Sequence, residues 1–263
     1  MSNIDKRPAV YSQEFYNTQF QTSIRSAKVI IPLILDLIEP KSVLDVGCGV
    51  GSWLKVFQDF GITDFFGIDG PWVQESQLLI PKNNFGRFDL SKPLDLNRSF
   101  NLVYSLEVAE HLPKDFAKTF VDSLVKHSSI VVFSAAVPGQ GGTDHVNEQW
   151  PEYWQEIFSQ KGYQVVDCFR DQIWKNTQIN YWYRQNILVF VRKSEIAKYP
   201  KLQNYLAQNR PLSRVHTEML THKLSYNEIF NLLKVKLTFG FFSAIRKIPI
   251  LGDMLVHVKR KLR

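Results

Sequence analysis

The sequence lacks the features that would place the chain in a membrane or in an oxidising compartment. Its 263 residues include only two cysteines, Cys48 and Cys168, which is too few for a disulfide framework and is typical of a reducing compartment. A membrane-spanning helix needs about 18 apolar residues in a row, and the longest candidate, residues 29–38, is interrupted by Pro32 and Asp36. The first eight residues are polar and lack the apolar segment of a secretory signal. We therefore expect a cytoplasmic protein.

Excess positive charge is missing from most of the chain. The sequence holds 32 Lys and Arg against 25 Asp and Glu, a net charge of +7. Residues 234–263 contain eight of the basic residues and one acid, so residues 1–233 carry 24 of each and balance at zero. A neutral body counts against a nucleic-acid partner, because nucleic acids bind to basic grooves. We expect a small molecule or a glycan as the acceptor instead.

Internal repeats and low-complexity segments are also absent. With 44% hydrophobic residues, the chain can bury one sizeable core with appendages. Apolar segments that read as strands alternate with amphipathic segments, which predicts an α/β fold with a doubly wound, seven-stranded, mostly parallel sheet. The expected strands are residues 43–46, 64–70, 85–90, 100–106, 130–134, 163–166 and 187–191.

The remaining segments divide the chain into three parts. Apolar residues at helical spacing predict a helix over residues 9–39, and further helices are expected over 113–127 and 151–161. We predict an N-terminal helical cap over residues 1–40, a core domain over 41–193 and a C-terminal helical extension over 194–263 that is basic and amphipathic from about residue 225.

A glycine-rich turn follows the first strand. Residues 45–51 read Asp-x-Gly-x-Gly-x-Gly, and Ser52 stands where a dinucleotide-binding fingerprint would have its third glycine. A strand, a glycine turn and a helix in succession predict free backbone N–H groups that face a ligand. The alternative is a glycine turn without a ligand. Cys48 lies inside the turn, where a small residue that fits is expected rather than a reactive thiol.

This pattern resembles the first motif of the class I S-adenosylmethionine (SAM)-dependent methyltransferases. The resemblance implies that Asp45 lies near the sulfonium of SAM and that residues 47–51 pass beneath its methionine and ribose. It also implies that the last strand runs antiparallel and that the N-terminal helices close over the cofactor. Simple packing of those helices on the sheet is the alternative.

Two more acids follow expected strands. Asp69 lies 18 residues after Gly51, where an acid accepts hydrogen bonds from the ribose hydroxyls, and the resemblance implies that Asp89 contacts the adenine amine. Ordinary turn or N-cap roles are the alternatives for both acids. The predicted cofactor contacts are Asp45, Gly47, Cys48, Gly49, Gly51, Asp69, Gly70, Asp89, Leu90 and Leu106.

A second constellation follows the fourth and fifth strands. Glu107, Glu110 and His111 are spaced to share one face of a helical turn, and the loop after the fifth strand adds His145. The carboxyl ends of parallel strands meet at one edge of a sheet. We therefore predict that these four residues are catalytic and form a mixed oxygen and nitrogen ligand set for Mg²⁺, Mn²⁺, Fe²⁺, Co²⁺ or Zn²⁺.

The Glu-x-x-Glu-His pattern with a later Asp-His resembles the metal site of RNA 3′-terminal 2′-O-methyltransferases, and it is similar to that of quinone-precursor O-methyltransferases. The resemblance implies a divalent ion, such as Mg²⁺ or Mn²⁺, that lowers the pKa of the acceptor hydroxyl. Two alternatives stay open: metal-free base catalysis by His111 or His145, and a structural role.

Residues 133–142, 145–151, 170–174 and 182–186 resemble a bacterial methyltransferase group often found with polysaccharide biosynthesis. Residues 139–142 are expected to act as a lid, and aromatic side chains to stack on a sugar ring: Trp150, Trp154, Trp174, Trp182 and Tyr183. We predict a SAM-dependent O-methyltransferase that acts on a sugar hydroxyl of a surface glycan or of its lipid-linked precursor. The alternatives are RNA 3′ ends, small phenolic or quinone-like acceptors, and a SAM-binding scaffold without activity.

The C-terminal segment 225–263 begins with a capping-box pattern, Ser225 to Glu228, and continues with Phe, Leu and Ile at helical spacing among basic residues. A basic amphipathic helix is typical of membrane-surface binding. We therefore predict peripheral contact with the inner face of the membrane. Docking to an acidic partner, a dimer helix and nucleic-acid binding are the alternatives.

Overall fold

The computed structural model of the chain describes residues 13–206 and 211–223. They belong to two compact units that divide between Arg214 and Val215, and we describe each unit by itself. The first unit contains the sheet and all predicted site residues. Within the described residues, the second unit contributes helix α8 (Thr217–Lys223). The basic segment 225–263, and with it the predicted membrane contact, lies outside the described residues.

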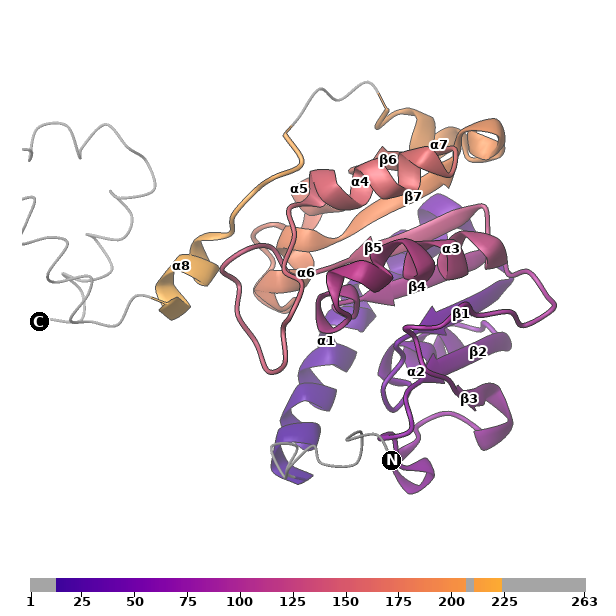
Figure 1. Cartoon of the computed structure of the whole chain (residues 1–263), viewed down its shortest axis with the longest axis vertical. Coiled ribbons are helices and arrows are strands. Elements are labelled where there is room, and N and C mark those ends of the chain that lie inside the picture. Colours follow the sequence, from indigo (N-terminus) through magenta and orange to yellow (C-terminus); the bar gives the residue numbers. More distant parts are fainter. Residues whose placement is uncertain (1–12, 207–210, 224–263) are drawn as a thin grey trace, which may run out of the picture. The chain divides into compact units, whose positions relative to one another are not determined.

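One seven-stranded sheet forms the centre of the first unit, with the order β3-β2-β1-β4-β5-β7-β6 (Figure 1). Strand β7 is antiparallel to both of its neighbours, and every other pairing is parallel. The predicted doubly wound sheet and its antiparallel last strand are therefore confirmed. The strands are β1 (Ser42–Val46), β2 (Asp64–Asp69), β3 (Phe85–Arg87), β4 (Leu102–Leu106), β5 (Ile130–Ser134), β6 (Tyr163–Val166) and β7 (Leu188–Arg192).

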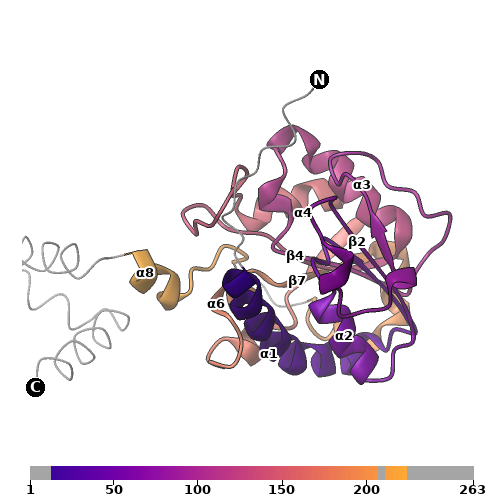
Figure 2. The same ribbon diagram turned by 90° about the horizontal axis from the view of Figure 1, so that it is seen from below.

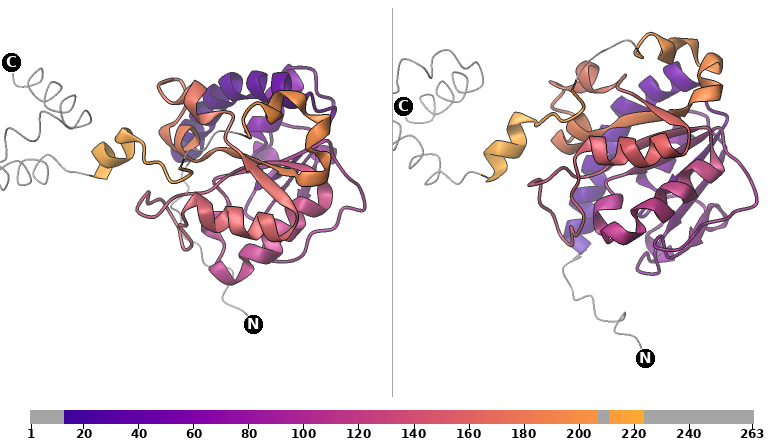
Figure 3. Two further views of the ribbon diagram at one scale, coloured as in Figure 1. Left: turned by 90° about the horizontal axis from the view of Figure 1, so that it is seen from above. Right: turned by 45° about the horizontal axis from the view of Figure 1, so that its top comes forward.

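Helices cover both faces of the sheet (Figure 2). Alternate residues of β1 face opposite sides: Val43 packs in one buried cluster with residues of α1 (Gln13–Ile38) and α2 (Ser52–Asp59). Leu44 packs in the other cluster with residues of α3 (Ala117–His127) and α4 (Pro151–Gln160). Helices α3 and α4 lie side by side on their face (Figure 3). Central strands that are buried on both faces are mostly apolar, and every residue of β1, β4 and β5 is buried.

Short elements fill the connections between these layers. They include α6 at the carboxyl edge, and η3, which begins three residues after the end of β4. Their bounds are η1 (Glu75–Gln77), η2 (Lys82–Asn84), η3 (Ala109–His111), η4 (Lys114–Phe116), α5 (Arg170–Ile173), α6 (Tyr181–Asn186), η5 (Lys193–Lys198) and α7 (Pro200–Gln203).

Several predicted boundaries differ from the observed ones. The third strand stops at Arg87 instead of residue 90, and the fourth begins at Leu102 instead of residue 100. The N-terminal helix runs from Gln13 to Ile38 in place of the predicted 9–39, and residues 9–12 lie outside the described part. Glu39 has a positive φ of 53°, a left-handed conformation that cannot continue a helix. Among the described helices, none is long and apolar enough to cross a membrane.

Candidate active site

The glycine turn after β1 has positive φ angles at Gly47 (90°), Gly49 (54°) and Gly51 (84°), which glycine adopts without cost. A Cβ added at Gly47 would lie 2.3 Å from a methyl carbon of Val108, whereas a Cβ at Gly49 would meet nothing within 4 Å. Gly47 is therefore needed for packing against the segment after β4. Gly49 instead faces open space, where another molecule can approach the backbone.

The prediction that this turn presents free backbone N–H groups is wrong for four of its residues, one of which, Gly51, donates to the Cys48 carbonyl at 2.9 Å. Gly47 and Cys48 both donate to the carbonyl of Ile68, at 2.8 and 3.1 Å. Gly49 donates to Asp69 Oδ2 at 2.6 Å. The end of β2 therefore satisfies these last three amides, and the surface that the turn offers is the Cα of Gly49.

Asp69 fixes the turn from the end of β2. Its second oxygen accepts a hydrogen bond from Gly70 N at 2.6 Å, and the Trp72 side chain also bonds to its carboxylate. Burial raises the pKa of Asp69 against these three hydrogen bonds. The predicted role in ribose binding stays a prediction.

Asp45 lies deeper, with 3% of its surface exposed, and its Oδ2 accepts a hydrogen bond of 2.6 Å from the Tyr104 hydroxyl. Burial raises the pKa of this carboxyl well above its ordinary value, opposed by the Tyr104 bond and supported by the negative charge of Asp69. Asp45 and Asp69 thus lie near each other beside the glycine turn. The contact of Asp45 with the sulfonium stays a prediction.

Asp89 is exposed and binds its own turn. It accepts hydrogen bonds from the Ser91 hydroxyl at 2.6 Å and the Ser91 amide at 3.1 Å, and Lys92 Nζ lies 3.5 Å away. The Ser91 hydroxyl bond is the main cause of the lowered pKa of Asp89. These contacts match the turn alternative, and the adenine contact stays a prediction. The other predicted cofactor neighbours, Leu90 and Leu106, are buried.

Cys48 is buried within the turn, and its thiol donates to the carbonyl of Gly49 at 3.4 Å. Burial, with the charges of Asp45 and Asp69, raises the pKa of the thiol well above its usual value. Because the thiolate is the reactive form, we expect iodoacetamide at pH 8 to modify Cys48 at least about 100-fold more slowly in the folded protein than in urea. Mass spectrometry of quenched peptides gives both rates. Equal rates would show a reactive thiol in the turn.

The second predicted constellation forms a cluster of three residues. Glu110, His111 and His145 each offer a ligand atom, and these atoms all lie within 4.8 Å of one another. The two imidazole rings meet edge to face with centroids 4.9 Å apart. The amides of Val146 and Asn147 donate to the Glu110 carbonyl at 2.9 and 3.0 Å, so the loop after β5 is held directly against η3. We refer to Glu110, His111 and His145 as the Glu–His–His cluster.

Glu110 is fully buried, and neither of its carboxylate oxygens makes a hydrogen bond of ordinary geometry in the described structure, although the backbone of Glu110 and Ala136 and the Glu107 carboxyl approach it. Burial, followed by the negative charge of Glu107, raises the pKa of Glu110 well above its ordinary value. A buried polar group without a partner is costly, and such groups concentrate at functional sites. One carboxylate and two imidazoles form a set of ligands that suits a divalent metal ion. The residues present therefore fit the predicted ion.

Glu107 differs from the prediction in two respects. Its φ of 56° is left-handed, and the helical turn begins only at Ala109, so the expected shared helical face from Glu107 to His111 is wrong. Its carboxylate also lies outside the Glu–His–His cluster. It accepts hydrogen bonds from Asn186 Nδ2 at 3.0 Å and from Gln140 Nε2 at 2.8 Å, while burial raises its pKa.

Sequence reasoning missed the amides around Glu107. Asn186 Nδ2 also donates to Gln140 Oε1 at 2.8 Å, and Gln185 Nε2 donates to Asn186 Oδ1 at 3.0 Å. All three amides are buried. Together they join the end of α6 and the loop after β5 to the end of β4. Amide side chains carry no spacing pattern, so nothing in the sequence indicated this network.

The aromatic residues that we expected to stack on a sugar ring differ in how far they are exposed. Trp154 and Tyr183 are core residues with 2% and 6% of their surface exposed, whereas Trp150, which precedes α4, exposes 40%. Trp174 packs beneath the Arg214 guanidinium, 4.3 Å from its ring centroid. Trp182 is half-buried. Of the five, Trp150 offers the most surface to an acceptor.

The glycine turn and the Glu–His–His cluster lie on one edge of the sheet. Val108 packs against Gly47, and the Tyr183 hydroxyl is close enough to Glu107 for the carboxylate charge to affect its pKa. The Tyr183 ring also lies 5.2 Å from the ring of Trp53, at the start of α2. The cofactor and acceptor ends of the predicted site are therefore adjacent, as methyl transfer requires.

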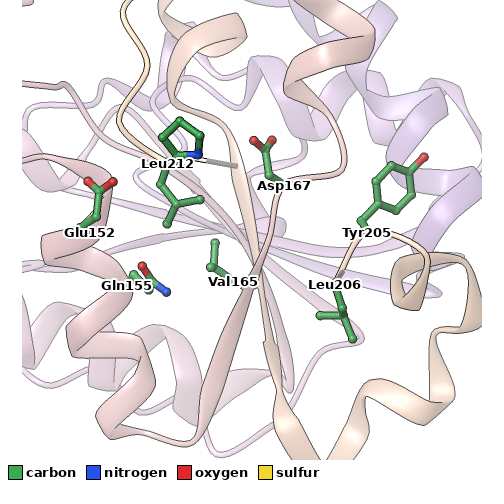
Figure 4. A pocket seen from close by; sticks show the side chains of 8 residues that line it. Glu152, Gln155, Val165, Asp167, Tyr205, Leu206 and Leu212 are labelled. Atoms are coloured by element: carbon green, nitrogen blue, oxygen red, sulfur yellow. The ribbon is translucent and has the colours of Figure 1, made fainter. Parts of the chain in front are cut away.

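A cavity of about 330 Å³ lies beside the edge strand β6 (Figure 4). None of its lining residues belongs to the predicted site, and residues 207–210, between the lining residues Leu206 and Pro211, lie outside the described part. We assign it no ligand. The lining residues are Glu152, Gln155, Val165, Asp167, Tyr205, Leu206, Pro211 and Leu212.

Comparison with known families identifies the protein. A family described as "Methyltransferase domain" matches residues 21–167, which is more than half of the chain. The chain belongs to the class I SAM-dependent methyltransferases. The match covers both the glycine turn and the Glu–His–His cluster. None of the curated proteins matches this methyltransferase significantly.

Solved structures with the same fold include three methyltransferase-like chains of low identity. The sugar N-methyltransferase KedS8 from Streptoalloteichus sp ATCC 53650 is 13% identical with a TM-score of 0.55, and the match covers 73% of this chain and 97% of that one. DesVI from Streptomyces venezuelae is 16% identical with a TM-score of 0.51, covering 70% and 99%. Magnesium protoporphyrin IX methyltransferase from Synechocystis PCC 6803, with bound SAH, is 16% identical with a TM-score of 0.50, covering 71% and 90%. At these identities they establish the fold of the methyltransferase.

Proposed function

We propose that this methyltransferase transfers the methyl group of SAM to a hydroxyl of a sugar, assisted by a divalent ion such as Mg²⁺ or Mn²⁺. The observation that carries the proposal is the Glu–His–His cluster, with its buried and unpartnered Glu110, at the same sheet edge as the glycine turn. The sugar belongs to a surface glycan or to its lipid-linked precursor.

The chemistry is a single displacement. The hydroxyl gives up its proton to a neighbouring base or to water, its oxygen forms a bond to the methyl carbon as the sulfur–carbon bond breaks, and S-adenosylhomocysteine leaves with the electron pair. SAM brings its own leaving group, so the protein has to activate the oxygen and hold it in line. A neutral hydroxyl is a poor nucleophile, and a divalent ion lowers the pKa of a bound hydroxyl. Glu110, His111 and His145 would hold the ion, and Glu107 would lie beside it as a second carboxylate.

Three features support a sugar acceptor. Residues 1–233 carry no net charge, which disfavours RNA 3′ ends. Trp150 offers an exposed aromatic face of the kind that packs on sugar rings. KedS8, which shares the fold, is described as a sugar N-methyltransferase. The cytoplasmic location at the inner face of the membrane, with residues 225–263 as the contact, belongs to the same proposal because lipid-linked glycans are made on a membrane surface.

A methyl-transfer assay with isotope-labelled SAM tests the proposal. The full chain is incubated with Mn²⁺ and, in separate reactions, with sugar acceptors, an RNA 3′ end or a catechol. We expect methylation of the sugars, and the carbon chemical shift of the new methyl group distinguishes an O-methyl from an N-methyl product. Selective methylation of RNA or catechol would overturn the sugar assignment. Absence of S-adenosylhomocysteine formation with every acceptor would favour a scaffold.

The ion is tested in the same assay. Excess EDTA should lower the rate at least about 100-fold, because loss of the ion costs more than the roughly 10- to 100-fold loss seen when a residue that supports a metal ligand is removed, and added Mn²⁺ should restore it. Glu110→Ala and His111→Ala should lose activity that Mn²⁺ does not restore. Full activity in EDTA would remove the ion from the reaction and leave base catalysis by His111 or His145.

A further inference from the structure

Glu148 is the polar centre of the loop that carries His145. Its Oε2 accepts a hydrogen bond from Gly139 N at 2.7 Å, and its Oε1 accepts one from Gly141 N at 2.5 Å. His145 Nδ1 lies 3.0 Å from the same Oε1. The side chains of His145 and Glu148 are only 12% and 19% exposed. A single carboxylate therefore holds two backbone amides and one imidazole.

An ionised carboxylate only accepts hydrogen bonds, so a neutral His145 that bonds to Glu148 must carry its proton on Nδ1. The lone pair is then on Nε2, the nitrogen that remains for the Glu–His–His cluster. The carboxylate already accepts hydrogen bonds from two backbone amides, those of Gly139 and Gly141. It therefore acts as an acceptor toward His145 as well.

Gly142 lies against Nε2 of His145. A Cβ at this position would lie 2.3 Å from His145 Nε2, so any other residue would press against the nitrogen. The loop thus bonds to one ring nitrogen and leaves the other uncovered by a side chain at position 142. Both features suit a histidine whose Nε2 binds a ligand or accepts a proton.

We propose that Glu148 is a positioning residue, which fixes His145 as the Nδ1–H tautomer and aims its Nε2 lone pair at the Glu–His–His cluster. The inference rests on the proposed function, because the tautomer of His145 decides whether Nε2 can bind an ion or accept the proton of an acceptor hydroxyl. Residues that hold metal-binding histidines in this way raise the basicity of the ligand and set its orientation. Metal-free base catalysis by His145 would need the same tautomer.

The tautomer is measured in the full chain without metal. Two-bond proton–nitrogen correlation spectra of ¹⁵N-histidine-labelled protein at neutral pH distinguish the two ring nitrogens, and the signals missing in His145→Gln identify the residue. We expect a protonated Nδ1 and an unprotonated Nε2. An Nε2–H tautomer, or a ring with both nitrogens protonated, would overturn the inference. This measurement on the unsubstituted protein requires no variant to fold.

The Glu148→Ala variant tests whether the Glu148 carboxylate sets the tautomer of His145. It should shift His145 toward the Nε2–H tautomer and weaken Mn²⁺ binding in calorimetry roughly 10- to 100-fold. Glu152→Ala is the matched control, because Glu152 accepts hydrogen bonds from Ser213 and has no histidine partner. It should change neither readout. An unchanged tautomer in a folded Glu148→Ala protein would contradict the assigned role.

The two proposals fail in different ways. If the unsubstituted protein does not bind Mn²⁺ but shows the Nδ1–H tautomer that Glu148→Ala loses, the positioning role stands and the metal part of the proposed function fails. If Mn²⁺ binds with equal affinity to the unsubstituted and Glu148→Ala proteins, the metal stands and the positioning role fails.

Discussion

Gly49→Ala is expected to weaken SAM binding severely in a protein that still folds. Gly49 has a φ of 54° and nothing within 4 Å of an added Cβ, so the substitution causes no clash inside the protein. Its cost to folding is the left-handed conformation alone, about 1–2 kcal/mol. The new methyl group would occupy the open space where the resemblance puts the methionine and ribose of SAM. We expect calorimetry to show SAM affinity reduced at least about 100-fold, which is about 2.7 kcal/mol.

The chain supplies matched controls for Gly49. Gly61 and Gly162 also have positive φ angles, 93° and 78°, and nothing lies within 4 Å of their added Cβ atoms. Gly61→Ala and Gly162→Ala should lose comparable stability in thermal unfolding while they bind SAM normally. Normal SAM binding by Gly49→Ala would mean that the cofactor does not approach the turn at this residue.

Gly47→Ala should behave differently from Gly49→Ala. Its Cβ would clash with Val108 at 2.3 Å, in addition to the strain of the left-handed backbone. The substitution should therefore lower the free energy of unfolding by more than Gly61→Ala does. The comparison separates a glycine needed for packing from one needed for ligand approach.

Glu110→Met is expected to stabilise the metal-free protein and to abolish methyl transfer. Glu110 is fully buried with both oxygens unpartnered, and replacing such a group by an apolar side chain of similar length removes its desolvation cost. We expect a gain of about 1–3 kcal/mol in the free energy of unfolding in EDTA. For a chain of this size that is roughly 2–4 °C in Tm for each kcal/mol.

The gain should depend on pH. Burial raises the pKa of Glu110 in the folded protein, so the folded state holds its proton more tightly than the unfolded state. The stability that comes from the protonated carboxyl is present below the unfolded pKa, about 4.3, and is lost as pH rises through the folded pKa. The advantage of Glu110→Met should thus be larger at pH 8 than at pH 5.

Glu156→Gln is the control for this experiment, because Glu156 is an exposed carboxylate of α4 that bonds to Gln160. It should leave both Tm and activity unchanged. A Glu110→Met protein that is less stable than the unsubstituted protein in EDTA would show that the folded structure already satisfies this carboxylate. Retained methyl transfer would exclude Glu110 from the site.

The sheet and the position of the glycine turn were predictable because they depend on local patterns. Apolar runs such as residues 130–134 become buried parallel strands, and glycines at alternate positions allow positive φ angles. Boundaries were less accurate where a side-chain bond ends an element. The third strand stops at Arg87, shortly before Asp89 and Ser91 form their own turn.

The site was predicted in part. The sequence brought Glu110, His111 and His145 into consideration, because they lie in the segments that follow two neighbouring strands, β4 and β5. It could not show that Glu107 adopts a left-handed backbone and bonds to Asn186, 79 residues away. Spacing arguments assume a regular helix, and here the backbone is not helical at Glu107 and Val108, the two residues before η3.

The sequence by itself determined the fold class and the family, and it named candidate site residues, since strand periodicity and glycine spacing are properties of neighbouring residues. Only the tertiary structure decided how these residues are used. In the folded protein Glu110 makes no hydrogen bond of ordinary geometry among the described residues. Glu107 accepts hydrogen bonds from the amides of Gln140 and Asn186, and His145 bonds to Glu148. These outcomes depend on which segments distant in the chain come together at the carboxyl edge, because burial and hydrogen bonding are set by the packed neighbours of a side chain.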